Sequence, residues 1–513
     1  MLTLKIGSLQ MKQRVLVAAI TAAVLAPAAQ ASGYKLNEQS AAGAGTAYAG
    51  RAAVVQDASV VFYNPAGMVK LKRAEITVGG SIIDATGDFD LDSYKNAAGQ
   101  PYTSLDNDTY SDGGDFIPTA VVPYAYYARP INEKFAAGFG IFVPFATNTD
   151  YKDNFIGGGF ADETQLTSVD FQPAIAYRVN DEFSVGFGLD ITYMKGLLSK
   201  QLDLVPYNAN LEGLNGGTGP TDTTGANRPY ADYKGFENHY EVEGDDWQLG
   251  YNLSMMWDVT SDITLGVTYR SEMKFKLKGD SEFKNKKDVV ALYSPAPNNY
   301  VIIDADTGYA QETGTTADGT FPKQGSEVPI TTPQSLTVSY AQQLTDKLQL
   351  VAGATWTQWS VFEDFDVKSS ESELGKIEAL SNIKVDDEYA GYIGHIEENW
   401  KDTTSVAVGA NYRLNDDWLL RSGYAYDQSP VRNTYRTARV PDNDRQWLSA
   451  GANYRINNDM DIDFAFSYMF FKDAKVNEFD RNVDGSVKTG SSNLQGTYSM
   501  KAVGYSLQFN YKI

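Results

Sequence analysis

The chain has 513 residues, enough for two or three ordinary domains or for one large barrel. Its formal charge of −22 at pH 7 excludes non-specific binding to nucleic acid, and the absence of cysteine agrees with an oxidising compartment. After residue 32 there is no stretch of 18 continuous apolar residues, so the sequence predicts no transmembrane helix.

The N-terminus has the features of a secretory signal peptide. Lys12 and Arg14 precede an apolar run at residues 15–25, and a small-residue stretch ending in Ala-Gln-Ala follows. An apolar run this short does not span a membrane. We therefore expect residues 1–31 to be the signal peptide and the mature chain to begin at Ser32.

Residues 32–73 do not have the pattern of strands. They are rich in glycine, alanine and serine, as at residues 40–45, and they contain the turn motif Asn64-Pro65-Ala66. A large barrel encloses more space than its own side chains fill. We expect residues 32–73 to form a hatch, or plug, inside the lumen of a barrel. The alternative is a periplasmic tail.

From residue 74 to the end the hydropathy pattern has a period of two. In the last segment Val503, Tyr505, Leu507 and Phe509 alternate with small or polar residues, which places the two sets on opposite faces of a strand. The sequence predicts an all-β fold, a 14-stranded antiparallel transmembrane β-barrel over residues 74–513. The expected strands are 74–85, 117–129, 134–143, 167–179, 182–203, 240–259, 262–280, 333–344, 347–366, 401–414, 417–427, 444–456, 459–474 and 496–513.

The connections between these strands alternate between short and long. The short ones are polar pairs such as Asn132-Glu133 and Asn180-Asp181, whereas 204–239, 281–332 and 367–400 are long polar stretches. Short turns on the periplasmic side and long loops outside are typical of outer-membrane barrels. The tryptophans lie near strand ends, which predicts two aromatic girdles: Trp257 and Trp418 at the periplasmic ends, and Trp247, Trp356, Trp359, Trp400 and Trp447 at the outer ends.

The seventh strand suggests a site for a carboxylate. If Ile263 to Tyr269 alternate toward lipid, then Arg270, Lys274 and Lys276 lie on the lumen face, where cations could hold an acidic head group. The alternative is charge balance against acidic loops. The candidate contacts for an apolar tail, by the same parity, are Phe142, Met194, Trp447 and Met469.

The sequence offers little for catalysis or metal binding. The two histidines, His239 and His395, lie near outer loop–strand junctions, and neither is on a strand facing a serine as a hydrolase would need. Asp88, Asp90 and Asp92 lack the glycine and glutamate of a calcium loop, so we interpret them as a solvated acidic loop. We expect no enzyme activity, metal or cofactor.

Several segments resemble the outer-membrane long-chain fatty acid transporter family (FadL, with the related toluene-uptake proteins). They are the opening Ser-Gly-Tyr-Lys-Leu-Asn-Glu at 32–38, Gly-x-Gly-x-Ala-Tyr-Ala-Gly at 43–50, Asn-Pro-Ala at 64–66, and the stretches 427–431 and 440–449. The similarity covers essentially the whole mature chain. It implies a hatch-closed barrel, ligand capture among the outer loops, a lumen site, and lateral release beside a kinked third strand.

In this chain the kink implied by the resemblance falls near Gly138, Gly140 and Pro144. Proline cannot donate a ladder hydrogen bond and glycine weakens a strand, so a local break there is physically reasonable. The alternative is that Pro144 merely ends the strand.

The resulting hypothesis is uptake of hydrophobic compounds across the outer membrane, with long-chain fatty acids favoured over aromatic hydrocarbons. The other classes are a diffusion porin, against which the hatch argues, and an adhesin or phage-receptor barrel. Expected partners are the hydrophobic ligand, outer-membrane lipid and lipopolysaccharide; we expect a monomer.

Overall fold

The computed structural model describes residues 33–513 except 97–98, 100, 106–109, 153, 202–237, 286–288, 294–299, 305–308, 313–314, 321–323, 370–391 and 489–490. The predicted signal peptide lies outside the described residues. No helix in the described part of the chain has the length and hydropathy of a membrane span.

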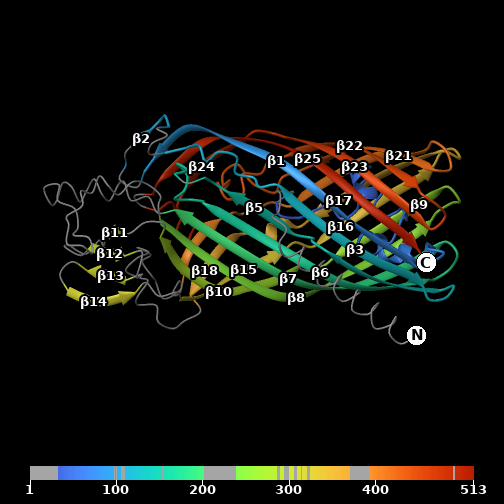
Figure 1. Cartoon of the computed structure of the whole chain (residues 1–513), viewed down its shortest axis with the longest axis horizontal. Coiled ribbons are helices and arrows are strands. Elements are labelled where there is room, and N and C mark those ends of the chain that lie inside the picture. The colour runs from blue at the N-terminus through green and yellow to red at the C-terminus, as the bar shows by residue number, and fades with distance from the viewer. Residues whose placement is uncertain are drawn as a thin grey trace, which may run out of the picture.

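All described strands except β11 to β14 form one closed antiparallel barrel (Figure 1), which confirms the predicted 14-stranded fold. The barrel strands in chain order are β1 (Glu75–Lys95), β3 (Ala120–Pro130), β4 with β5 (Phe135–Phe142, Ala146–Asp150), β6 (Glu163–Arg178), β7 (Phe183–Gln201), β8 (Asn238–Asp258), β9 with β10 (Ile263–Arg270, Met273–Asn285), β15 with β16 (Gln324–Thr332, Ser335–Gln343), β17 with β18 (Leu348–Thr357, Asp364–Ser369), β19 with β20 (Tyr392–Glu397, Thr403–Arg413), β21 (Trp418–Asp427), β22 (Arg445–Arg455), β23 with β24 (Met460–Phe471, Ala474–Phe479) and β25 (Asn493–Lys512). The barrel closes where β1 pairs with β25, from Glu75 opposite Lys512 to Lys95 opposite Asn493.

The remaining described elements are small. β2 (Pro101–Tyr102) pairs antiparallel with the last residues of β1. A separate four-stranded sheet within the long connection 281–332 consists of β11 (Val289–Tyr293), β12 (Tyr300–Asp304), β13 (Tyr309–Glu312) and β14 (Thr315–Thr320). The helical pieces are α2 (Ala41–Ala44), α3 (Val60–Tyr63), η1 (Pro65–Lys70) and η3 (Trp359–Val361).

The short turns share one hydrogen-bonding scheme. In the turn after β3, the Asn132 side-chain oxygen accepts from the backbone N–H of Phe135 at 2.9 Å, and Asn180, Asn415 and Asn457 bond equivalent amides. This is the local side-chain to backbone bonding that favours asparagine in tight turns. The C-terminus lies at this short-turn end, and the long connections lie at the opposite, long-loop end (Figure 1).

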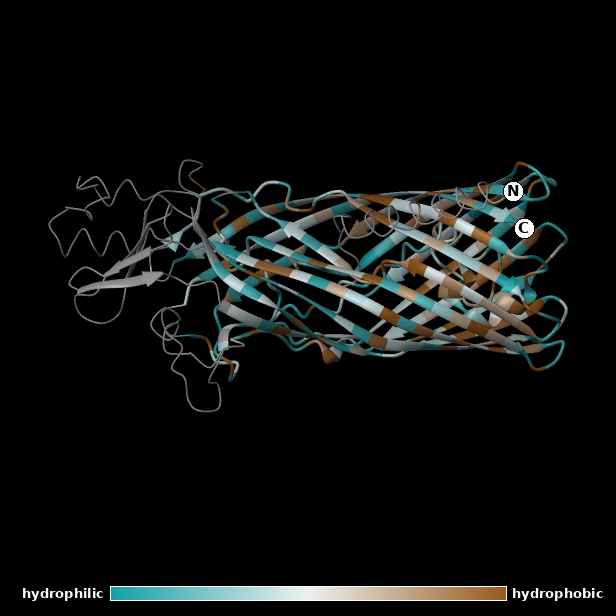
Figure 2. Cartoon of the chain, turned by 60° about the horizontal axis from the view of Figure 1, so that its bottom comes forward, coloured by the Kyte–Doolittle hydropathy of each residue, from teal (hydrophilic) through white to brown (hydrophobic). Residues whose placement is uncertain are grey.

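The outer face of the barrel is apolar. Brown apolar residues alternate with teal polar ones along the strands (Figure 2), and residues such as Val78, Leu249 and Phe464 are exposed. Of the tryptophans, Trp247, Trp257, Trp356 and Trp418 are exposed at this face. The prediction of an outer aromatic girdle is wrong for Trp359, Trp400 and Trp447, whose side chains are buried inside the barrel. Trp447 takes the inward position of its strand, and the other two follow strand ends where the chain turns inward.

Candidate functional site

Residues 33–70, the described part of the hatch apart from its exit to β1, lie inside the lumen, most of them near the short-turn end (blue in Figure 1). Glycines on the inner wall make room for them. A Cβ added to Gly266 would lie 1.8 Å from the carbonyl oxygen of Ala52, and one added to Gly423 would lie 2.1 Å from the Thr46 carbonyl. The wall is therefore shaped to the hatch backbone at positions where only glycine fits.

The Asn-Pro-Ala turn is fixed by hydrogen bonds. The Asn64 amide donates to the carbonyls of Ala52 (2.6 Å) and Met255 (3.0 Å), and its oxygen accepts from the N–H of Ala66 (3.1 Å). Pro65 begins η1, where its missing N–H is not needed. One side chain thus links two parts of the hatch to β8.

The same turn docks on small residues of the wall. The Ala66 N–H also donates to the hydroxyl of Ser254 at 3.0 Å, and the Ser184 hydroxyl donates to the Ala66 carbonyl at 3.0 Å. A Cβ on Gly186 would lie 2.3 Å from the Ala66 nitrogen. Hydrogen bonds rather than apolar contact hold this turn in place.

The third strand is interrupted after β4. Four residue steps, from Phe142 to Ala146, match only three on the neighbouring β6, from Asp170 to Thr167. β5 then pairs with β6 alone, and no pairing between β3 and β5 occurs among the described residues. The wall therefore lacks its ladder on one side of β5, beyond a break that contains Pro144.

The glycines expected at the kink have another role. Gly138 and Gly140 lie in regular ladder pairs with both β3 and β6. A Cβ on Gly138 would lie 2.5 Å from Val61 and 2.6 Å from Met68, both in the hatch. Gly138 therefore admits the hatch, and the break itself falls at Pro144.

The start of the hatch is joined to this break. Lys35 forms an antiparallel bridge with Phe145, and the N–H of Ala146 donates to the Tyr34 carbonyl at 2.8 Å. Farther along the same edge of β5, the segment before β3 takes over, because the Asp150 N–H donates to the Phe116 carbonyl at 2.9 Å. A movement of the N-terminal segment would therefore act directly on the gap in the wall.

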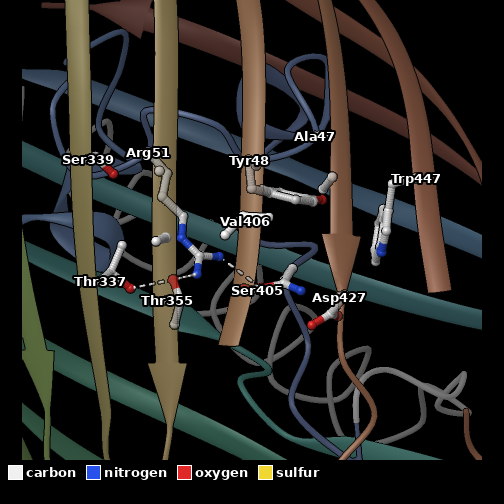
Figure 3. Close-up of a pocket in the computed structure, with 15 residues that line it drawn as sticks. Ala47, Tyr48, Arg51, Thr337, Ser339, Thr355, Ser405, Val406, Asp427 and Trp447 are labelled. Atoms are coloured by element: carbon white, nitrogen blue, oxygen red, sulfur yellow. Dashed lines mark hydrogen bonds between the residues drawn. The ribbon is translucent and has the colours of Figure 1, made fainter. Parts of the chain in front are cut away.

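A small polar and aromatic pocket lies between the hatch and the strands β16 to β22 (Figure 3). Arg51 of the hatch reaches across it. The guanidinium donates to the Asn37 side-chain oxygen at 2.8 Å and to the Thr355 hydroxyl at 2.6 Å. On the other side the rings of Tyr48 and Trp447 meet edge to face, with centroids 6.0 Å apart.

Arg51 is the notable charge of this pocket. Among the described ion pairs none includes it, and the nearby Asp427 is bound by Arg445, whose Nη2 lies 2.9 Å from its Oδ2. The cavity measures about 30 Å³, the share of one water molecule, whereas sites for organic ligands enclose roughly 300–1,000 Å³. In this conformation the pocket is too small for an organic ligand, and the hatch residues Asn37, Ala47, Tyr48 and Arg51 form one of its walls.

The hatch loop that closes the pocket is in an unusual conformation. Ala47 and Tyr48 have φ of 50° and 62°, and Gly50 follows at 69°. The left-handed region costs residues other than glycine about 1–2 kcal/mol each. Such strain is found in segments with two conformations of similar free energy.

Toward the long-loop end the inner face becomes apolar. We call this lining the mouth cluster: Tyr34, Phe145, Leu166, Met194, Leu198, Val242, Met273, Phe275, Leu277, Val328, Ile330, Trp359, Phe362, Phe365, Val367, Trp400, Val431 and Val440. Its aromatic members pack closely, with the rings of Tyr34 and Trp359 4.7 Å apart and those of Phe362 and Trp400 4.6 Å apart.

The structure separates the predicted cationic residues. Arg270 is buried, and its guanidinium lies 2.7 Å from Asp190 Oδ2 and 3.0 Å from the Gln172 side-chain oxygen. It also faces the ring of Phe62 in the hatch at 4.8 Å. Arg270 is thus already neutralised, and it joins the hatch to the wall.

Lys274 and Lys276 point the other way, with side chains 75% and 65% exposed, contrary to the expected lumen-facing row. Seven residue steps on β8, from Asn252 to Asp245, match eight on the seventh strand, from Arg270 to Lys278. The extra residue is a bulge, and one added residue exchanges the faces of every side chain after it.

The predicted tail contacts do not form one site. Trp447 and Met469 are cross-strand partners beside the closed pocket, Met194 belongs to the mouth cluster, and Phe142 packs on Phe62 at 4.7 Å. Arg51 was not predicted. The one hint in the sequence is that it is a lone arginine in a segment of small residues.

Comparison with known proteins gives consistent matches. Residues 22–513 match the family described as outer membrane protein transport protein (OMPP1/FadL/TodX). The chain is 27% identical over 461 residues to the long-chain fatty acid transport protein of Escherichia coli O6:H1, covering 90% of this chain and 92% of that protein. It is 30% identical over 495 residues to a putative outer membrane protein of Neisseria meningitidis serogroup B, covering 96% of each.

Solved structures share the fold. A Pseudomonas aeruginosa FadL homologue superposes with a TM-score of 0.72 at 26% identity, over 93% of this chain and 99% of that one. The P. putida toluene transporter TodX gives a TM-score of 0.57 at 15% identity, over 91% and 98%, which shows likeness of fold alone.

Proposed function

Because the chain belongs to the outer membrane protein transport family (OMPP1/FadL/TodX), we propose that the hydrophobic compounds it carries across the outer membrane are long-chain fatty acids. Arg51 is the observation that carries this choice. Its N–H groups meet neutral oxygens only, in a pocket with aromatic walls. A fatty acid carboxylate would replace these neutral acceptors with a charged one, in the often bidentate pairing that gives arginine its strongest hydrogen bonds.

The path we infer begins at the mouth cluster. An acyl chain would bury its methylenes there, at about 0.8 kcal/mol for each CH₂ group. In the path we infer, Met194 and Phe275 contact the chain at the mouth. Trp447 and Met469 contact it deeper in the lumen, beside Tyr48. Lys274 and Lys276 have no part in it, because they face outward.

Release depends on movement of the hatch. Binding at Arg51 would displace the strained loop of Ala47 and Tyr48, and with it the segment bridged to Phe145. A ligand can shift such an equilibrium only by its preference for one state. We propose that Asn64, Pro65 and Ala66 form the fixed turn of this gate, and that the gap beyond Pro144 is the lateral exit.

The test compares Arg51→Gln with Arg455→Gln, which changes an exposed arginine at the short-turn end. Cells lacking other fatty acid and hydrocarbon transporters would be assayed for uptake of oleate and of toluene. We expect the Arg51 variant to lose about tenfold in oleate uptake, since hydrogen bonds to charged groups contribute about 1.5–3 kcal/mol. Toluene uptake by the Arg51 variant should be unchanged, and the Arg455 variant should take up both compounds as the wild type does.

Other outcomes favour the other functions. Wild-type uptake of toluene but not of oleate would assign the protein to aromatic hydrocarbons. Uptake of neither would favour a surface barrel such as an adhesin. Unchanged oleate uptake by the Arg51 variant would overturn the role of Arg51 in holding the carboxylate.

A further inference from the structure

Three potential metal ligands lie together on the hairpin of β18 and β19, at the long-loop end of the barrel (Figure 1). His395 of β19 pairs directly with Asp366 of β18, and Asp364 lies two residues earlier on the same strand. Because alternate residues of a strand share a face, and paired residues stand side by side, all three side chains point to one side of the hairpin. Their ligand atoms lie within 4.8 Å of one another.

The imidazole of His395 is held in a defined orientation. Its Nδ1 lies 2.7 Å from Asp366 Oδ1, so this nitrogen carries a hydrogen and donates a hydrogen bond to the carboxylate. The other nitrogen, Nε2, has no hydrogen-bond partner among the described residues, although the side chain is only 5% exposed. It faces Asp364 Oδ1 at 3.8 Å, which is too long for a hydrogen bond.

We propose that this cluster binds a divalent transition-metal ion of the zinc type. His395 Nε2 and one oxygen of Asp364 would be the protein ligands, water would complete the coordination, and Asp366 would position the ring. Zinc–ligand bonds of about 2.0–2.2 Å place two ligand atoms roughly 3.0–3.5 Å apart, so the observed 3.8 Å requires only a small adjustment. A carboxylate that accepts the second N–H of a ligating histidine is the common arrangement in such sites.

The donor set determines which ion fits. An imidazole nitrogen with carboxylate oxygen suits zinc, cobalt, nickel or copper, whereas calcium and magnesium require oxygen ligands. The neighbouring Glu397 is not counted as a ligand. Its carboxylate is bound by Arg481, with Nε 3.4 Å from Oε2, and by the Asn399 amide at 2.6 Å.

One cation lies near the site. Lys368 Nζ is 4.0 Å from Asp366 Oδ2, but it lies over the ring of Tyr392, 4.6 Å from its centroid. It therefore approaches the carboxylate that positions the ring and leaves the space between His395 and Asp364 free for an ion.

A bound ion would connect the hairpin to the mouth of the barrel. Phe365, between the two aspartates in sequence, points to the opposite face and packs on Phe362 at 4.8 Å within the mouth cluster. Linking β18 to β19 from one face would therefore also restrain the aromatic side chains on the other face.

The chain contains only two histidines, which makes the test direct. The untagged, full-length mature protein in detergent, freed of metal with a chelator, would be titrated with Zn²⁺ in excess Ca²⁺. The variants are His395→Asn, Asp364→Asn and Asp366→Asn, with His239→Asn as the matched control. Heat-modifiable gel mobility would establish that each variant is a folded barrel. Hydrogen exchange would be measured over residues 364–369 and 392–397.

We expect one Zn²⁺ per chain, lost in His395→Asn and Asp364→Asn and unchanged in His239→Asn. Asp366→Asn should bind about 10–100-fold more weakly, as is typical when the partner of a ligating histidine is altered. Zn²⁺ should also slow exchange of the hairpin in the wild-type protein and in His239→Asn, but not in His395→Asn or Asp364→Asn. The proposal is overturned if folded wild-type protein binds no Zn²⁺, if binding survives in His395→Asn, or if Ca²⁺ displaces the ion.

Discussion

The two ends of the lumen are filled by different chemistry. At the short-turn end the hatch meets the wall through hydrogen bonds, such as those of Asn64, Ser184 and Ser254, through backbone contact at glycines, and through one apolar cluster that includes Val61 and Met68. At the long-loop end the lining is apolar and aromatic, with Trp359 and Trp400 fully buried. Hydrogen bonds are directional and exchangeable with water, whereas apolar packing is not directional. Hydrogen bonds would let the hatch take the discrete positions that the proposed gating requires, and an apolar mouth would suit acyl chains of varied shape.

The largest expected effect comes from replacing a glycine under the hatch. Gly266→Val would place side-chain atoms where the Ala52 carbonyl lies, so the hatch should fail to seat while strand pairing persists. In planar bilayers we expect steady ion conductance from this variant and none from the wild type. Gly504→Val is the control, because a Cβ there is 3.6 Å from its nearest neighbour. Closed channels in the Gly266 variant would show that the hatch does not fill the pore.

Truncation at the mouth should act differently. Trp359→Ala removes a ring that packs on Tyr34 at 4.7 Å, and we expect about tenfold weaker binding of a fluorescent fatty acid without any conductance. Trp356→Ala, on the outer face three residues earlier, is the control. An equal loss in both variants would contradict a binding role for the mouth cluster.

Weakening the fixed turn should have a smaller effect. Asn64→Ala combined with Pro65→Ala removes three hydrogen bonds and the fixed φ of the turn. The barrel should insert normally and remain heat-modifiable, but oleate uptake should fall severalfold. Wild-type uptake by a correctly inserted variant would show that this turn does not gate transport.

The smallest effect concerns pH at the mouth. Burial raises the pKa of Glu398 to about 7, although Trp400 Nε1 (2.8 Å), the Thr437 hydroxyl and nearby Arg439 favour its charged form. Since the folded pKa lies above the unfolded value of about 4.5, the stabilisation is complete at acidic pH and is lost as pH rises through about 7.

Hydrogen exchange of residues 398–402, corrected for intrinsic rates, should therefore be a few times faster at pH 8 than at pH 6. Glu398→Gln should remove this dependence. A variant that keeps the wild-type dependence would assign it to another group.

The order of the strands could be predicted because alternation is local. A strand with one face in lipid shows the alternation of apolar and polar side chains within a short stretch of sequence, as Val503 to Phe509 do. The bulge near Ser271 could not be predicted in the same way, since one extra residue leaves both halves with good alternation. Lys274 and Lys276 were therefore assigned to the wrong face, although the alternation is regular both before the bulge, in β9, and after it, in β10.

Contacts inside the lumen depend on distant pairs. Arg51 meets Thr355, and Gly266 makes room for Ala52, across separations of more than 200 residues. No pattern within a short stretch of sequence indicates which distant residue such a side chain contacts. Gly138 illustrates the difficulty, because a glycine in a strand is equally compatible with a break and with close approach of another backbone.

The pairing of β1 with β25 has a consequence for assembly. The first and last strands are joined along their whole length, and Ile513 N–H bonds the Ala74 carbonyl at 2.7 Å. The cylinder cannot close until the final residues of the chain are in place, so its seam is the least local contact in the molecule and should form late. The hatch precedes β1, and the strands it touches, from β1 and β3 to β25, all come after it. The sheet must therefore wrap around the hatch as it grows, and a chain lacking β25 would leave two open edges and an uncovered core, a target for quality-control proteolysis.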